Sequence, residues 1–232
     1  MSGHETTITA VLRRAACGVC VAMFAACGSA PPSPDWEVDA HAALDAYARD
    51  ALRGRTALAD RDLARAIDAV SSTGRPGLVA RVQLTRCAIE RAALAFDACP
   101  DPVATGRDGG AEEHAYAQFL SGHWSGLAPR DLPETYRAVV AAKDDSARLA
   151  ALRGIDDRLS RLVACGALMG ATRLPPDGMD IAIDAASEGG LRRALLAWLG
   201  ARERAASLAG DTAAVSRIRA RIAVAGGTPT TR

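Results

Sequence analysis

Apolar side chains recur every three or four residues along most of the chain after residue 35. This spacing predicts a helix from Trp36 to about Arg53, ended by Gly54, and a second helix around Leu63 and Val70. No segment of useful length alternates apolar and polar residues with the period of two that a β-strand requires. We therefore predict an all-α fold.

The middle of the chain continues the pattern, with interruptions. Residues 74–77 (GRPG) break it, and a longer helix follows from about Leu78 to Phe96. That helix is apolar on two sides, which is typical of a helix packed between neighbours. By composition residues 97–110 are a loop and the most mobile segment, and Ala111 to about Leu120 is again helical.

Helix start signals mark the next elements. Pro133 is placed for the first turn of a helix that runs to about Lys143. The acidic pairs at 144–145 and 156–157 each precede an apolar periodic run, which is typical of helix N-caps. Residues 175–177 (PPD) restart the pattern once more.

The last third holds the clearest pair of helices, with a stop and a start at Gly210 and Asp211. Its apolar positions are Leu191, Leu195, Trp198, Leu199, Val215, Ile218 and Ile222. This segment resembles a helical hairpin of tetratricopeptide arrays over roughly 35 residues, without the full repeat signature. The resemblance implies helical hairpins packed as a short α-solenoid. An irregular bundle is the alternative for the predicted domain at 36–226, which a disordered tail at 227–232 follows.

The N-terminus has the features of an export signal. A polar leader ends in Arg13 and Arg14, and residues 15–26 (AACGVCVAMFAA) are then almost wholly apolar. This run is much shorter than the ~20 residues that a spanning helix needs. We therefore expect residues 1–26 to be removed as a signal peptide.

The signal ends in Phe24-Ala25-Ala26-Cys27-Gly28, which resembles the lipobox of bacterial lipoproteins. The resemblance implies a diacylglyceryl group on the thiol of Cys27, cleavage before this residue, and anchoring of the chain in a membrane by acyl chains. Ser29 stands where many such proteins carry an Asp that retains them in the inner membrane, so the outer membrane is favoured, with the domain in the periplasm. Residues 27–35 are then a lipid-anchored, Pro-rich linker.

Charge and composition exclude one class of partner. The chain has 28 basic and 27 acidic side chains, and residues 1–26 carry two arginines and one glutamate, so the remainder is formally neutral. A nucleic-acid-binding domain usually has a basic stripe with stacking aromatic side chains, and neither is present. We expect no nucleic acid as a partner.

Candidate chemistry is sparse. The region of Glu113, His114 and His123 is the one cluster that resembles a site, but two zinc-binding histidines on one helix would be three or four residues apart. We therefore predict no metal, no cofactor and no enzymatic activity. The leading hypothesis is an interaction module that binds another envelope protein through a groove between helices; the alternative is a helical enzyme or a ligand- or metal-binding protein that uses the cluster above.

Trp124 lies in a glycine-flanked turn, where a large ring is either an anchor for a partner or packed in the loop. Cys87, Cys99 and Cys165 leave an odd thiol after the leader is removed. A Cys87–Cys99 bridge requires the helix to end near residue 94 and the chain to fold back. A Cys99–Cys165 bridge and no bridge at all are the alternatives.

Overall fold

The computed structural model describes residues 33–97, 99, 107 and 109–227, and these contain ten α-helices, one short 3-10 helix and no strand. The all-α prediction is confirmed for this part of the chain. Contacts divide the chain into two units, Met1–Ser33 and Pro34–Arg232. The predicted signal peptide, Cys27 and most of the predicted linker lie outside the described residues.

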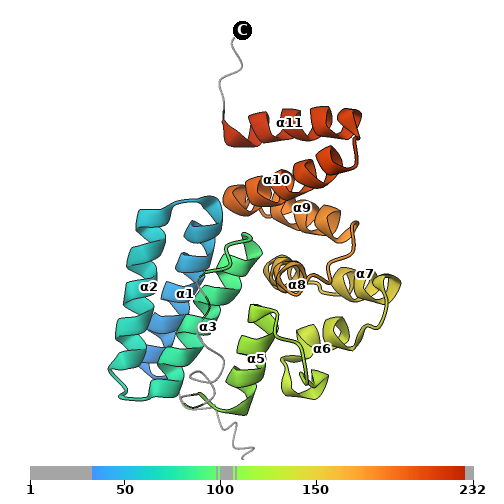
Figure 1. Ribbon diagram of the computed structural model, residues 1–232. Helices are drawn as coiled ribbons and strands as arrows, with labels where there is room; N and C mark the ends of the chain where they lie inside the picture. Colours follow the sequence, from blue (N-terminus) through green and yellow to red (C-terminus); the bar gives the residue numbers. More distant parts are fainter. Residues whose placement is uncertain (1–32, 98, 100–106, 108, 228–232) are drawn as a thin grey trace, which may run out of the picture. The chain divides into compact units, whose positions relative to one another are not determined.

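Helices α1 (Asp35–Arg53), α2 (Thr56–Ser71) and α3 (Pro76–Ala92) pack side by side (Figure 1). Helix α1 ends as predicted at Gly54, which has a φ of 83°. Short side chains let these helices approach closely, and the small cluster between them consists of Ala40, Ala43, Ala66, Val70 and Val82.

Helix α3 ends four residues earlier than the apolar pattern predicts. Leu94 adopts a left-handed conformation, with a φ of 58°, and turns the chain away from the helix axis. Phe96 was expected on the buried face but is 40% exposed, and the guanidinium of Arg91 lies over its ring at 4.5 Å. The prediction was wrong here because the apolar period continues beyond the point where the backbone turns.

The next helices are α5 (Ala111–Ser121), α6 (Glu134–Ala141), α7 (Asp145–Arg153) and α8 (Arg158–Gly170), with the 3-10 helix η1 at Pro129–Asp131. The predicted N-caps are confirmed. The carboxylate of Asp144 accepts a hydrogen bond from the amide of Ala147 at 2.8 Å, and that of Asp157 accepts one from Ser160 at 2.7 Å.

Pro133 precedes α6 as its N-cap, and that helix ends at Ala141, two residues earlier than predicted. Of the loop predicted at 97–110, residues 98, 100–106 and 108 lie outside the described part of the chain. Arg107 and Gly109 are helical, so the loop prediction was wrong at these two positions.

Helix α8 is the centre of the core. It packs against α3, α5, α6, α7 and α9, and every residue from Leu162 to Leu168 is buried. A helix surrounded in this way belongs to an irregular bundle, because helices of a regular solenoid contact mainly their neighbours along the chain.

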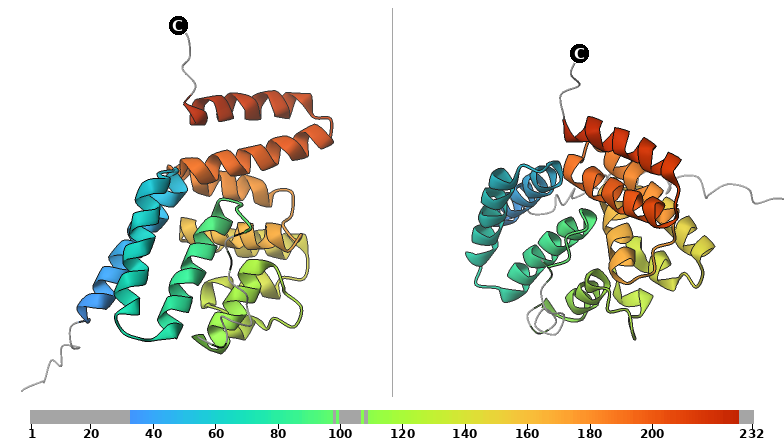
Figure 2. Two further views of the ribbon diagram at one scale, coloured as in Figure 1. Left: turned by 60° about the vertical axis from the view of Figure 1, so that its left-hand side comes forward. Right: turned by 45° about the horizontal axis from the view of Figure 1, so that its top comes forward.

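The last three helices are α9 (Gly178–Glu188), α10 (Arg192–Leu208) and α11 (Thr212–Gly226). As expected, α10 and α11 form an antiparallel hairpin (Figure 2), and Asp211 caps α11 through the amide of Ala214. Trp198 on α10 is fully buried, and its indole N–H donates to the carbonyl of Ala92 at 2.9 Å.

An ion pair also connects α10 to α3, and a hydrogen bond extends it to α1. Both guanidinium Nη atoms of Arg193 donate to the carboxylate of Glu90 on α3, and the hydroxyl of Tyr47 on α1 donates to the same carboxylate at 3.3 Å. Bidentate pairs of this kind fix orientation as well as distance.

Among the described residues, no helix combines the length and the apolar character that crossing a bilayer requires.

Candidate functional site

A pocket of about 400 Å³ opens between α3, α5 and the start of α6. Its charged lining residues are Arg81, Glu112, Glu113 and Arg137. The carboxylate of Glu113 is buried, with the residue 8% exposed, and accepts a hydrogen bond from Nε of Arg81. Burial of a carboxylate is tolerated here because a cation and the amino end of α5 both compensate its charge.

The position of Glu113 is fixed by two glycines that precede α5. A Cβ on Gly109 would lie 2.6 Å from Cγ of Glu113, and Gly110 has a φ of 112°. Both positions therefore need glycine, one for space and the other for its backbone conformation. The carboxylate thus has a local structural explanation, and its burial alone does not indicate catalysis.

The structure does not assemble the predicted cluster of Glu113, His114 and His123. Of the three, only Glu113 lines the pocket. His123 is exposed beyond the end of α5, and its Nδ1 lies 3.1 Å from Oγ of Ser121. Within the described ranges no three His, Cys, Asp or Glu side chains are grouped closely enough to hold a metal ion.

Stacked aromatic rings lie behind this pocket. Tyr116 stacks on Tyr136 with ring centroids 5.7 Å apart, and Phe119 stacks on Tyr136 at 4.9 Å. Burial raises the pKa of both tyrosines above the ordinary value for a phenol. Both phenols therefore stay neutral at physiological pH and form part of a packed, uncharged wall.

Trp124 belongs to the same packed region and is not an exposed anchor. Its ring is 8% exposed and stacks on Phe119 at 5.4 Å, while its indole N–H donates to the carbonyl of Phe119 at 2.9 Å. The guanidinium of Arg173 lies 5.5 Å from the ring centroid. The interaction role suggested for Trp124 does not fit this burial, and we assign the ring to the core.

Another hollow is a groove of about 1000 Å³ between α6, α7 and the start of α8. Six of its thirteen lining residues are alanines, which present only a methyl group: Ala138, Ala141, Ala142, Ala147, Ala150 and Ala151. Because these side chains are short, the helices leave space that their own residues do not fill. We call this feature the alanine groove.

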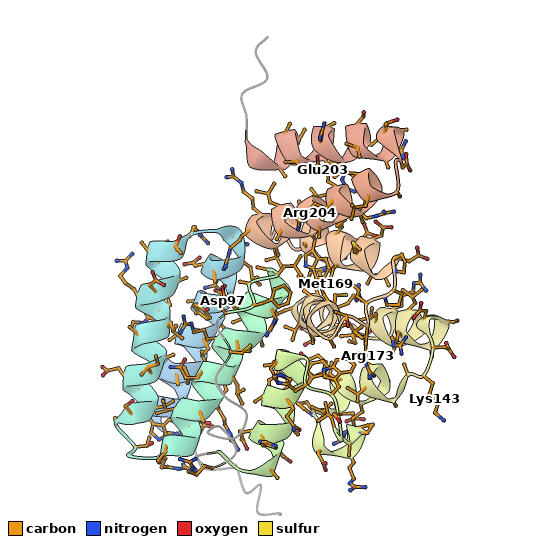
Figure 3. All side chains as sticks on the ribbon, in the orientation of Figure 1. Asp97, Lys143, Met169, Arg173, Glu203 and Arg204 are labelled. Atoms are coloured by element: carbon orange, nitrogen blue, oxygen red, sulfur yellow. A yellow bond between two sulfur atoms is a disulfide. The ribbon has the colours of Figure 1, made fainter. Side chains whose placement is uncertain are left out.

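The alanine groove has an acidic rim. Glu134, Asp156 and Asp157 are its charged lining residues, and none of the Lys and Arg side chains that the structure describes lines it. The carboxylate of Asp157 already caps α8, whereas no ion pair joins Glu134 or Asp156 to any cation in the described part of the chain. Lys143, in the connection from α6 to α7, points away from the helices (Figure 3).

The sequence pattern did not reveal the alanine groove. Alanine at helical spacing is equally typical of a buried face, and the sequence does not show that Ala138 and Ala150 are exposed. The available signal was the low number of large apolar residues on the 134–151 segment, which leaves its helices without enough side-chain volume to close against each other.

The cysteines form one bridge and one free thiol in the described residues. Cys87 and Cys99 are joined by a disulfide with their Cα atoms 4.6 Å apart, which the early end of α3 makes possible. This is the first of the three alternatives left open by the sequence. Cys165 is fully buried, and burial raises the pKa of its thiol to about 12, so it is not a nucleophile at neutral pH.

Comparison of this chain with models of protein families, with curated proteins and with solved structures finds no match.

Proposed function

We propose that this protein is a lipid-anchored helical module, exported to a bacterial periplasm, that binds a segment of another envelope protein in the alanine groove. The observation that carries the proposal is the groove itself, which has a volume of about 1000 Å³ and six alanines in its lining. A partner helix with large apolar side chains would fill that space, and this is a common mode of peptide recognition.

The charge of the groove specifies the partner further. Glu134 and Asp156 have no cationic partner among the described residues, so basic side chains flanking an apolar stripe would complement them. We therefore expect a basic, amphipathic helix. We expect no enzymatic step, cofactor or metal in this role.

Binding can be tested with the full chain in a nonionic detergent and a synthetic helical peptide that carries leucine on one face and arginine beside it. Ala150→Trp places a large ring in the groove at an exposed position, and we expect it to weaken binding at least about tenfold. Ala64→Trp, on an exposed face of α2, is the matched control and should bind as the unmodified chain does. Equal affinity for the two variants would contradict the proposal.

The acidic rim is tested separately. Glu134→Gln combined with Asp156→Asn should weaken binding of the same peptide and reduce its dependence on salt, because charge attraction is screened by ions. Both substitutions leave the cap at Asp157 intact. A peptide with glutamate in place of arginine should bind poorly, and binding as tight as that of the basic peptide would refute the assigned chemistry.

The anchoring part of the proposal rests on the sequence around Cys27 and is compatible with the Cys87–Cys99 disulfide, since stable disulfides are typical of exported proteins. Cys27→Ser should abolish incorporation of radiolabelled fatty acid and leave the precursor uncut, because a hydroxyl is a far weaker nucleophile than a thiolate. Continued labelling of this variant would rule out the lipobox assignment.

A second candidate function is small-ligand binding in the α3–α5–α6 pocket, whose volume of about 400 Å³ is in the range of ligand sites. The exposed side chains of Arg137 and Glu112 present both signs of charge there, beside the buried Glu113, which suits a small zwitterion. Metal analysis of the purified full chain distinguishes the metal-binding form of this alternative. One zinc ion retained per chain would favour it over the interaction proposal.

A further inference from the structure

A third hollow, of about 250 Å³, lies between the last three helices, α9, α10 and α11. Its floor is apolar and comes from Ile183, Leu199 and Ile218, all of which are buried. Arg202, Arg217 and Arg221 also line it, together with the single carboxylate of Asp180. Three cations and one anion around an apolar floor leave this groove with excess positive charge.

Ion pairs within the structure account for only part of this charge. Nε of Arg202 donates to Asp180 at 3.1 Å, and the neighbouring Arg219, outside the groove, pairs with Glu203 at 2.6 Å. Arg217 and Arg221 are exposed, and within the described residues neither forms an ion pair or a side-chain hydrogen bond. The two unpaired guanidinium groups therefore have all their donors free.

Repulsion between Arg217 and Arg221 destabilises α11 when no anion lies between them. Four residues separate Arg217 from Arg221, which puts them on one face of the helix about 6 Å apart along its axis. Like charges at this spacing repel each other. No contact within the described structure compensates the repulsion, whereas an anion between them would.

We propose that the groove between α9, α10 and α11 binds an acidic peptide segment, in which an Asp or Glu carboxylate adjoins an aliphatic side chain. Arg217 and Arg221 hold the carboxylate, since a guanidinium forms paired hydrogen bonds to it. The aliphatic side chain lies over Ile218, which has the most exposed surface of the three floor residues. This site goes beyond the proposed function, because it uses other helices and a partner segment of opposite charge.

The test uses the full chain in nonionic detergent and a fluorescent peptide with blocked ends that alternates glutamate with leucine. Its glutamine counterpart removes the charge and keeps the shape. The glutamate peptide should bind with an affinity that falls with salt, and the glutamine peptide should bind at least about tenfold more weakly. Equal binding of both peptides would overturn the proposal.

Two double variants locate the site. Arg217→Gln with Arg221→Gln should weaken binding of the glutamate peptide at least about tenfold, since both guanidinium groups are lost. Arg75→Gln with Arg153→Gln removes two exposed arginines elsewhere and should leave binding unchanged. Equal loss in the two variants would show attraction to net charge alone and would overturn the proposal.

Inorganic phosphate separates a carboxylate site from a general anion site. It should displace the glutamate peptide only at concentrations where sodium chloride of equal ionic strength does so too. Displacement by phosphate well below that concentration would overturn the assignment to a carboxylate. This experiment uses an acidic peptide and variants of α11, whereas the alanine groove is tested with a basic peptide and variants of α6 to α8. Failure of one proposal is therefore distinguishable from failure of the other.

Discussion

Substitution of Gly166 in α8 by alanine tests how closely α8 packs against α3. A Cβ at position 166 would lie 2.7 Å from the carbonyl carbon of Arg91 and still nearer to its oxygen. Both atoms belong to the backbone of α3, which cannot move aside as a flexible side chain does. The added methyl group must therefore push the two helices apart in the centre of the core.

Gly200 in α10 provides the matched control. A Cβ there would meet only the guanidinium end of Arg204, at 3.6 Å, which is an ordinary van der Waals contact. Both glycines lie inside helices, so both substitutions gain the same helix propensity, about 0.5–1 kcal/mol. The two variants differ only in the space that surrounds the new methyl group.

The expected changes have opposite signs. Overpacking of a filled core costs about 1–3 kcal/mol, so Gly166→Ala should lower the free energy of unfolding despite its gain in propensity. Gly200→Ala should raise that free energy by about 0.5–1 kcal/mol. With a slope of about 2 kcal/mol per molar urea, the unfolding midpoints of the two variants should differ by about 1 M.

The measurement is urea unfolding of the full chain in nonionic detergent, followed by the helical circular-dichroism signal. Equal slopes for the two variants would show that the comparison concerns the native state. Gly166→Ala with a midpoint equal to or above that of the unmodified chain would refute the close approach of α3 and α8.

Two further outcomes follow from the contacts at the end of α3. Replacing Cys87 and Cys99 together by alanine should lower the free energy of unfolding by about 3 kcal/mol, because the bridge closes a loop across 12 positions; an unchanged urea midpoint would contradict this. Burial raises the pKa of Glu90, but the hydrogen bonds and charge of Arg193, with smaller effects of Tyr47 and Arg86, outweigh it, so the net pKa is lowered. The contribution of this carboxylate to the free energy of unfolding is therefore full above its unfolded-state pKa and is lost as the pH falls through its folded-state pKa. Arg193→Gln should therefore cost about 1–2 kcal/mol at pH 7, allowing for solvent screening, and progressively less below about pH 4; a cost that does not change with pH would contradict the pair.

Local signals determined most of the helices. The caps at Asp144 and Asp157 were predictable because a carboxylate bonds an amide three residues ahead, whatever the rest of the chain does. The end of α3 was not, because Ala93 to Phe96 continue the apolar period. The backbone turn at Leu94 is accompanied by long-range features, the packing of α3 against other helices and the bridge from Cys87 to Cys99, which this run of residues does not encode.

The sequence by itself determined the helical class, the caps and the resemblance around Cys27, since each depends on residues close together in the chain. Only the tertiary structure decided which helices meet, and hence the early end of α3, the burial of Trp124 and the exposure of Ala150. Gly166 and Gly200 illustrate the division. In the sequence, both glycines interrupt an apolar helix and look alike. Long-range packing sets the distance from each glycine to a neighbouring backbone, and this distance decides whether an added methyl group lowers or raises the free energy of unfolding.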